Sequence, residues 1–274
     1  VMHSDDGFAL LFTDPAPAVL DVVEEAARTG VRSLLVISSG FAEAGEEGRR
    51  LQDRLLRTAR EHGMRVVGPN SFGVANTDPG VRLNATLAPQ LPPAGHFGLF
   101  SQSGALGVAV LASAASRNLG ISVFASAGNR VDVSGNDVMQ YWIDDDDTHA
   151  VGLYLESVGN PRKFTRIARQ LALRKPVVVV KSEVSAFGRP PGHRVRETRT
   201  PPRAFREMLR QSGVIRVGNV HQLFDVAQLV VQADSKYAID TYTSWMDAHR
   251  RRGFCAEAAH ALVGHAFEHG LTGR

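Results

Sequence analysis

Serine, glutamine and glycine residues stand together in Ser101-Gln102-Ser103-Gly104, between an apolar segment and a helical pattern. Their hydroxyls and free backbone amides would meet at the start of a helix, where an anion is favoured. We therefore predict a phosphate-binding site at Ser101, Gln102, Ser103 and Gly104. An ordinary serine N-cap, worth about 1 kcal/mol, fits the same pattern equally well.

A second polar turn, Gly128-Asn129, follows the next apolar segment of the chain. Glycine allows a backbone to approach a ligand closely, so both residues are predicted to join the phosphate site. The alternative is a plain turn followed by a helix N-cap from Asn136 or Asp137.

A carboxylate and an imidazole complete the candidate chemistry. Glu156 ends the apolar segment 151–155, and ligands collect at the carboxyl ends of parallel strands. A carboxylate there can orient a histidine, or it can cap a neighbouring helix. His193 lies among arginines in the segment 185–200, and an imidazole accepts a phosphoryl group well near neutral pH. A solvated basic loop is the alternative, and the chain has ten histidines in all.

Two series of alternating apolar strands and amphipathic helices must position these residues. The first series has strands at 8–12, 33–37 and 64–67, with helices opening at 14–17 and running over 47–61. Such alternation predicts a parallel sheet. A full dinucleotide-type unit usually has about five or six strands, so we expect this domain to be the C-terminal part of a larger one.

The second series predicts another doubly wound unit. Its strands are expected at 96–100, 122–126, 151–155, 176–180 and 214–217, and its helices at about 105–117, 137–143, 162–173, 201–211 and 220–231. The proline-containing stretch 76–95 has no periodicity and is typical of a crossing between domains. We place the domains at 1–88 and 89–232, followed by a linker or part of a further domain at 233–274.

Composition excludes several classes of protein. The 274 residues are 43% hydrophobic and 22% charged, which predicts an ordinary globular protein. No apolar run approaches the roughly 20 residues of a membrane span, and no secretory signal is evident, so we expect a cytoplasmic protein. Cys255 is the single cysteine, which excludes an intramolecular disulfide and a thiolate zinc cluster, and we predict no metal site.

Charge favours an anionic ligand without indicating nucleic acid. The formal net charge is +3, with arginine-rich segments at 189–206 and 250–252. Neither segment is interleaved with aromatic residues or placed on a nucleic-acid-binding motif, so no nucleic-acid partner is expected. A nicotinamide-dependent dehydrogenase is also disfavoured, because no G-x-G-x-x-G follows any predicted strand.

Seven short motifs between residues 8 and 231 resemble, in their order, the alpha subunits of succinyl-CoA synthetase and ADP-forming acetyl-CoA synthetases. The motifs are the first strand with Asp14-Pro15-Ala16-Pro17, Val36-Ile37-Ser38-Ser39-Gly40-Phe41, Gly68-Pro69-Asn70, Ser101-Gln102-Ser103-Gly104, Leu155-Glu156, Gly192-His193 and Gly213-Val214. The resemblance implies an α/β protein with a partial Rossmann-like CoA-binding domain followed by a flavodoxin-like CoA-ligase domain.

The resemblance also implies site residues. His193 would be transiently phosphorylated, Glu156 would orient it, and the serine-glycine segment 101–104 would receive the phosphate. Coenzyme A or acyl-CoA would contact two further groups of residues. These are Pro15, Ala16 and Pro17, and then Ile37, Ser38, Ser39 and Asn70. Val108 would line the acyl pocket and favours a substrate other than a polar dicarboxylate.

The implied activity needs a second protein. Acyl-CoA and phosphate would give an acyl phosphate, which phosphorylates the histidine, which in turn phosphorylates a nucleoside diphosphate. ATP or ADP with Mg would bind only through an ATP-grasp beta-type subunit or domain. The chain alone is therefore expected to be inactive, and an oligomer is expected. The sequence leaves open the acyl substrate and the choice between ADP and GDP.

Departures from the family pattern keep an alternative open. Arg194-Val195-Arg196 follows His193 where the family has small residues, and the segment 250–258 is similar to the pyrophosphate loop of GNAT acetyltransferases. A basic helix start explains that segment equally well. The alternative function is a non-catalytic CoA-binding or assembly module of an acetyltransferase fusion.

Overall fold

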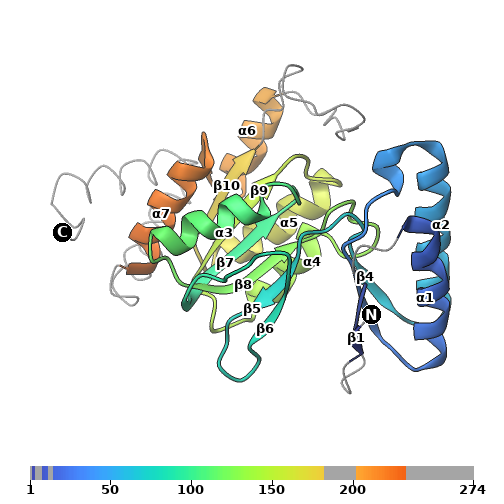
Figure 1. The fold of residues 1–274 in the computed structure, drawn as a ribbon. Helices are drawn as coiled ribbons and strands as arrows, with labels where there is room; N and C mark the ends of the chain where they lie inside the picture. The colour runs from blue at the N-terminus through green and yellow to red at the C-terminus, as the bar shows by residue number, and fades with distance from the viewer. Residues whose placement is uncertain (1, 4–7, 12–14, 182–201, 233–274) are drawn as a thin grey trace, which may run out of the picture.

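The computed structural model describes residues 2–3, 8–11, 15–181 and 202–232, which form two α/β domains side by side (Figure 1). His193 and the segment 233–274, with its GNAT-like motif, lie outside the described residues. No helix in the described ranges has both the length and the apolar character needed to cross a membrane.

The first domain is a four-stranded sheet in the order β1-β2-β3-β4, covered on one face by two helices. Its elements are β1 (Met2–His3), β2 (Phe8–Leu11), α1 (Ala16–Arg28), β3 (Ser33–Val36), the short 3-10 helix η1 (Ala42–Ala44), α2 (Glu46–Glu61) and β4 (Arg65–Val67). Strands β2, β3 and β4 are parallel, and β1 is antiparallel to β2. Leu34 and Val36 pack against α1 and α2, because alternate residues of a strand face the same side.

The second domain has a seven-stranded sheet in the order β11-β10-β9-β7-β8-β5-β6. Its parallel strands are β7 (Ala94–Ser101), β8 (Ile121–Ser126), β9 (Ala150–Leu155), β10 (Val177–Lys181) and β11 (Ile215–Val217). Numbered along the chain, these five strands have the spatial order 2-1-3-4-5, which is the flavodoxin-like order. The antiparallel hairpin β5 (Gly73–Asn76) and β6 (Leu83–Thr86) extends the sheet beyond β8.

Helices cover both faces of this second sheet. On one face α3 (Gly107–Ser116) and α7 (Val220–Gln232) bury apolar residues such as Val110 and Phe224. On the other face α4 (Gly135–Ile143), α5 (Pro161–Ala172) and α6 (Pro202–Gln211) do the same with Trp142, Phe164 and Phe205. Each helix therefore presents one apolar stripe to the sheet, as the sequence pattern predicted.

Backbone hydrogen bonds join the two domains beside β4. Val133 N donates to Val66 O at 3.0 Å, Val131 N to Gly68 O at 3.1 Å and Asn129 N to Pro69 O at 2.8 Å. The loop 129–133 of the second domain thus runs along the strand and turn 66–69 of the first.

A side-chain pair reinforces this contact. Arg65 Nε donates to Asp132 Oδ2 at 2.7 Å, and Val66 N donates to the same oxygen at 3.0 Å. The hydrogen bond from Arg65 to Asp132 raises the pKa of the guanidinium. The Asp132 side chain is only 13% exposed, but that of Arg65 is 58% exposed, so solvent still screens this pair.

The hairpin differs from the sequence expectation for residues 76–95. That stretch was predicted to cross between domains without regular structure, yet it contains β6 and belongs to the second sheet. Each strand of the hairpin has only four residues, and two of them in β5 and three in β6 are partly buried or exposed, so the apolar pattern is too short to detect. The boundary near residue 88 stays a prediction, and the residues before it already contribute two strands to the second sheet.

We expect Gly152→Ala to destabilise the second domain by about 1–3 kcal/mol, because overpacking a buried strand forces its neighbours apart. Gly152 lies in the middle of β9, and an added methyl group would stand 2.5 Å from Cζ of the buried Phe97. Urea unfolding measures the change in the free energy of unfolding.

Gly80→Ala is the matched control, because the nearest atom to an added methyl group there is the Asp78 carboxylate at 3.0 Å, in an exposed turn. It should stay within about 0.5 kcal/mol of the parent. Equal losses in both variants would contradict the packing around Gly152.

Candidate functional site

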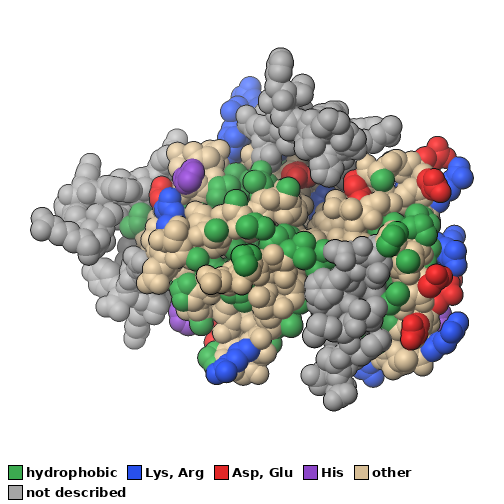
Figure 2. All heavy atoms as spheres, viewed as in Figure 1, with side chains coloured by type: hydrophobic (Ala, Val, Ile, Leu, Met, Phe, Trp, Pro, Cys, Tyr) green, Lys and Arg blue, Asp and Glu red, His purple; other side chains and the backbone are tan. Residues whose placement is uncertain are grey.

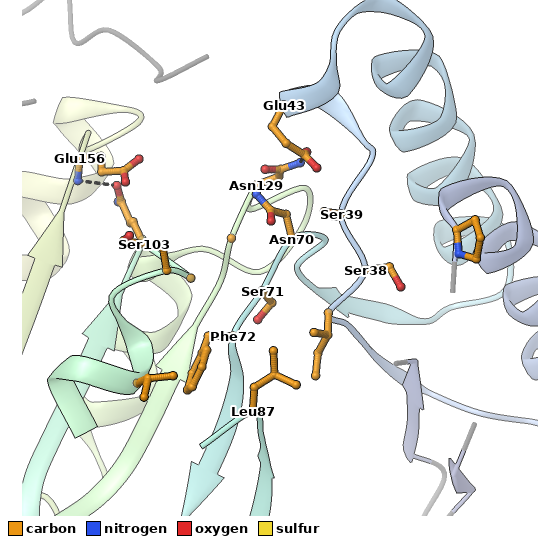
Figure 3. Close-up of a pocket in the computed structure, with 17 residues that line it drawn as sticks. Ser38, Ser39, Glu43, Asn70, Ser71, Phe72, Leu87, Ser103, Asn129 and Glu156 are labelled. Atoms are coloured by element: carbon orange, nitrogen blue, oxygen red, sulfur yellow. Dashed lines mark hydrogen bonds between the residues drawn. The ribbon is translucent and has the colours of Figure 1, made fainter. Parts of the chain in front are cut away.

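A cavity of about 750 Å³ lies between the two domains, where the carboxyl ends of β3, β7, β8 and β9 approach one another (Figure 3). Its volume is in the range of small-molecule sites, roughly 300–1,000 Å³. Eleven of the residues predicted from sequence line it: Pro15, Ile37, Ser38, Ser39, Asn70, Gln102, Ser103, Gly104, Gly128, Asn129 and Glu156.

Four predicted residues do not line the cavity or lie outside the described chain. Ala16 and Pro17 belong to α1 and are not among the lining residues. Ser101 is fully buried, and its hydroxyl donates to Ser103 O at 2.9 Å and accepts from Ser103 N at 3.2 Å. Ser101 therefore shapes the turn beneath the cavity. His193 is outside the described residues.

The start of α3 presents backbone donors to the cavity. Gly104 and Ala105 line it, and Gly107 N donates to Gly104 O at 3.0 Å. Within the described chain, no acceptor takes the amides of Gly104, Ala105 or Leu106. Free amides at a helix N-terminus, together with the helix dipole, favour a bound anion.

Gln102 supports the site with its side chain already engaged. Its Oε1 accepts from the backbone amides of Glu156 and Ser157 at 2.8 and 2.9 Å, and its Nε2 donates to Ser157 O at 2.6 Å. These bonds tie the end of β7 to the segment after β9. Gln102 thus holds Glu156 in place through its backbone.

The carboxylate of Glu156 remains available. Figure 3 shows Glu156 next to Ser103, with its backbone amide held by the hydrogen bond to Gln102. No described residue makes a hydrogen bond or ion pair with this carboxylate. It can therefore accept a hydrogen bond from a ligand or from an incoming imidazole.

The first-domain wall contains an unsatisfied hydroxyl. Ser38 is only 4% exposed, and its Oγ has no hydrogen-bond partner in the described part of the protein. Its carbonyl accepts from Asn70 N at 2.9 Å, which brings Asn70 to the cavity in a left-handed conformation with φ of 56°. Buried hydroxyls are nearly always hydrogen-bonded, so Ser38 fits a site that a polar ligand completes.

Glu43 and Asn129 link the two walls of the cavity. Glu43 Oε1 accepts from Gly40 N at 2.6 Å, while its Oε2 accepts from Asn129 Nδ2 at 2.5 Å. Asn129 Nδ2 also donates to Gln52 Oε1 at 2.9 Å. The polar end of the cavity is therefore held by a partly buried network that spans both domains.

Gly128 is required by close backbone packing. Its φ is 50°, and an added Cβ would stand 2.2 Å from Pro69 O and 2.3 Å from Asn70 O. The turn that carries Asn129 can thus lie directly on the first-domain turn.

Sequence reasoning did not find all the lining residues. The structure adds Glu43, Ser71, Phe72, Leu87 and Ala105, and it places Val108 in the wall as well. Glu43 lies before a predicted helix, Phe72 precedes the unpatterned stretch 76–95 and Leu87 lies within it, so no recognised motif marked them. For Glu43, the sequence offered one cue: it lies three residues after Gly40, a spacing at which its carboxylate can accept from the glycine amide.

The structure is that of a two-domain α/β protein with a polar cavity between the carboxyl ends of its sheets. Residues 94–230 match the family described as succinyl-CoA ligase like flavodoxin domain, and residues 7–77 match a CoA binding domain. The chain belongs to this succinyl-CoA-ligase-like family, within the NDP-forming acyl-CoA synthetases.

Relatives of known name agree with this assignment. The acetate–CoA ligase [ADP-forming] I subunit alpha of Pyrococcus furiosus is 36% identical over 215 residues, 78% of this chain and 46% of that protein. The acetate–CoA ligase [ADP-forming] I of Archaeoglobus fulgidus is 38% identical over 219 residues, 80% of this chain and 32% of that protein.

A solved structure has the same fold. Apo acetyl-coenzyme A synthetase 1 of Candidatus Korarchaeum cryptofilum superposes with a TM-score of 0.74 at 32% identity, over 82% of this chain and 48% of that one. The chain thus spans about half or less of the length of the relatives it matches.

We expect Asn129→Asp to lower the free energy of unfolding by about 1–3 kcal/mol at pH 7, because a carboxylate would replace the amide donor beside Glu43. The deficit should shrink at acid pH, where the carboxylate pair takes up a proton and the repulsion is removed. Urea unfolding at several pH values measures it.

Asn84→Asp is the control. The exposed Asn84 uses only its side-chain oxygen, which accepts from Thr86 N at 3.2 Å and from Thr86 Oγ1 at 2.8 Å. An aspartate at this position can accept the same hydrogen bonds. A loss at Asn129 no larger than that at Asn84 would show that the network between the domains is not stabilising.

Proposed function

We propose that this chain is the CoA-binding and CoA-ligase part of an NDP-forming acyl-CoA synthetase. The observation that carries the proposal is that one cavity is lined by Gly104 and Ala105, whose amides are free, by Glu156, whose carboxylate has no described partner, and by Ser38, whose hydroxyl is unsatisfied. Family membership supports it, and the comparisons give no support to the alternative of a non-catalytic module.

In this proposal each wall of the cavity binds a different substrate. The first-domain wall, with Pro15, Ile37, Ser38 and Ser39 and then Asn70, contacts coenzyme A. The amides at the start of α3 hold phosphate, since a helix N-terminus stabilises the negative charge of a phosphoryl group. Gly128 allows the second turn to approach the same group.

The proposed reaction proceeds in balanced transfers. An oxygen of inorganic phosphate attacks the acyl carbonyl carbon, the carbon–sulfur bond breaks, and coenzyme A leaves as its thiol after taking a proton. A ring nitrogen of His193 then attacks phosphorus, and the acyl carboxylate leaves. Finally an oxygen of a nucleoside diphosphate attacks the same phosphorus and frees the imidazole.

Glu156 has a positioning role in the second transfer. A carboxylate that accepts from one imidazole nitrogen leaves the other free as nucleophile and stabilises the positive ring. Gln102 keeps Glu156 in position by accepting its backbone amide at 2.8 Å.

The nucleotide step requires a partner in this proposal. We infer an ATP-grasp beta-type subunit or domain that binds ADP or ATP with Mg. The Pyrococcus relative is named a subunit alpha, which supports a second subunit here. Among the described residues, no group of three or more His, Cys, Asp or Glu side chains could hold a metal ion.

We expect phosphate on His193 when the chain and a competent ATP-grasp partner are incubated together with ATP, or with an acyl-CoA and inorganic phosphate. Phosphohistidine is acid-labile, so intact-mass and peptide spectra recorded at neutral to alkaline pH measure it. His193→Ala should abolish the signal, whereas His62→Ala, on an exposed turn, should leave it unchanged. Absence of phosphate with a partner shown to be active would refute the catalytic proposal.

Glu156→Gln should slow phosphorylation of His193 by roughly 10²-fold, because the amide does not stabilise a positive imidazole as a carboxylate does. Glu47→Gln, on the exposed side of α2, is the matched control. Equal rates in the two variants would exclude the role of Glu156.

A further inference from the structure

A second cavity lies beside the first, on the face of the second sheet that α4 and α5 cover. Its volume is about 200 Å³, and it is lined by the starts of these two helices and by the end of β9. Gln102 lines both cavities, so they share part of one wall. The second cavity is smaller than the roughly 300–1,000 Å³ of sites for drug-sized ligands, so it fits a ligand of only a few atoms.

The charge of this second cavity is opposite to that of the first. Arg130 and Lys163 line it, and no Asp or Glu of the described chain is among its lining residues. The Asp137 carboxylate lies 3.5 Å from Lys163 Nζ, and its Oδ2 accepts from Ser134 N at 2.9 Å and from Ser134 Oγ at 2.6 Å. One carboxylate thus offsets one of two cations, and these described groups keep a net positive charge.

On the surface of the first domain, by contrast, cations lie among carboxylates. Figure 2 shows Lys and Arg side chains interspersed with Asp and Glu side chains over α1 and α2. Arg50 pairs there with Glu46 at 2.7 Å, and Arg54 pairs with Glu24 at 2.9 Å. No carboxylate from the described ranges lines the second cavity, so its two cations can attract a bound anion.

The first turn of α4 supplies backbone donors to this cavity. Gly135 and Asn136 are the first two residues of the helix, and both line the cavity. The amide of Asp137 is capped by the Ser134 side chain, whereas no acceptor in the part of the chain that the structure describes takes the amides of Gly135 and Asn136. Free amides at a helix N-terminus favour a bound anion.

An unsatisfied side chain at the same place indicates that a ligand completes the site. Asn136 is only 9% exposed, and its Oδ1 has no hydrogen-bond partner among the described residues. A buried amide oxygen without a donor costs free energy, and such atoms are rare in folded proteins. Because this oxygen can only accept, the ligand must bring a hydrogen-bond donor as well as negative charge.

Hydrogen bonds hold the Arg130 side chain in the cavity wall. Its Nη1 donates to Ser157 O at 3.2 Å, and its Nη2 donates to Ser157 Oγ at 3.0 Å. Its backbone is left-handed, with φ of 55°, and its amide donates to Ala127 O at 2.8 Å. Ser157 lines the same cavity. The guanidinium charge is therefore fixed beside the space that an anion would fill.

We propose that this second cavity binds hydrogen phosphate, separately from the phosphate that reacts in the first. Its oxygens accept from the amides of Gly135 and Asn136, and its charge is balanced by Arg130 and Lys163. Its hydroxyl donates to Oδ1 of Asn136. Sulfate has the same tetrahedral shape but no acid hydrogen near neutral pH, so it leaves that oxygen unsatisfied. The site does not depend on the function proposed above.

Amide NMR spectra of the full chain, recorded during titration with inorganic phosphate near neutral pH, test this site. The Gly135 and Asn136 amides report the second cavity, and the Gly104 and Ala105 amides report the first, so each cavity gives its own dissociation constant. Ionic strength is held constant, because salt screens charge. We expect saturable shifts at Gly135 and Asn136, and sulfate should bind there about tenfold more weakly.

Variants of the cavity wall extend the test. Lys163→Gln should weaken phosphate binding at Gly135 by about fivefold, because it removes a cation from the wall. Arg162→Gln is the matched control, since it removes the same charge from the preceding, exposed residue of α5, which does not line this cavity. Asn136→Leu removes the acceptor at similar size and should abolish the preference for phosphate over sulfate; circular dichroism reports folding of each variant.

The outcomes separate this site from the proposed function. The absence of saturable shifts at Gly135 and Asn136 at millimolar phosphate, equal affinity for sulfate, or equal effects of Lys163→Gln and Arg162→Gln would overturn it. Shifts at Gly135 and Asn136 without shifts at Gly104 and Ala105 would support the second site and count against a phosphate site at the start of α3.

Discussion

The hydrogen-bonded contact between the loop 129–133 and the segment 66–69 is the constraint on which the rest of the site depends. Three backbone hydrogen bonds and the Arg65–Asp132 pair fix the register of one domain against the other. Because the cavity takes one wall from each domain, a shift in this register would separate the start of α3 from Ser38. Leu35 and Ile37, on the sheet face opposite α1 and α2, pack with Ala85 of the hairpin and oppose such a shift.

Polar groups around the cavity fall into two sets with different consequences. Ser101, Gln102, Ser71 and Asn129 are satisfied by the protein itself, so their hydrogen bonds hold the walls in place. Within the described residues, the Ser38 hydroxyl, the Glu156 carboxylate and the Gly104 and Ala105 amides just before α3 have no such partners. A buried polar group without a partner costs free energy, which a ligand can recover on binding. The unsatisfied set therefore marks the ligand's position better than the residue types alone.

Periodicity made most of the fold predictable, and its absence explains what was missed. Apolar spacing placed the parallel strands β2 to β4 and β7 to β11, and the seven α-helices of the described residues, because these elements bury regular apolar stripes. The two-residue strand β1 was not predicted. The β5–β6 hairpin was not predicted, because its strands are short and half-polar. Phe72 and Leu87, which lie beside these strands, were therefore not recognised as lining residues. The rule that ligands bind at carboxyl ends of parallel strands brought Ser103, Gly128 and Glu156 together from sequence. It did not predict that the Ser101 side chain would point into the turn instead of the cavity.

The charge of the cavity is unfavourable for phosphoryl transfer by the described residues alone. Its described lining offers two carboxylates and backbone amides but no cationic side chain, while a phosphoryl group in transfer needs positive charge around it. Helix dipoles supply about half an elementary charge, which does not offset two carboxylates. We infer that the missing charge comes from the arginines of the segment 189–199 beside His193 and from the metal-bound nucleotide of a partner. Phosphoryl transfer would then be limited to the assembled complex, where hydrolysis of the phosphorylated histidine is least favoured.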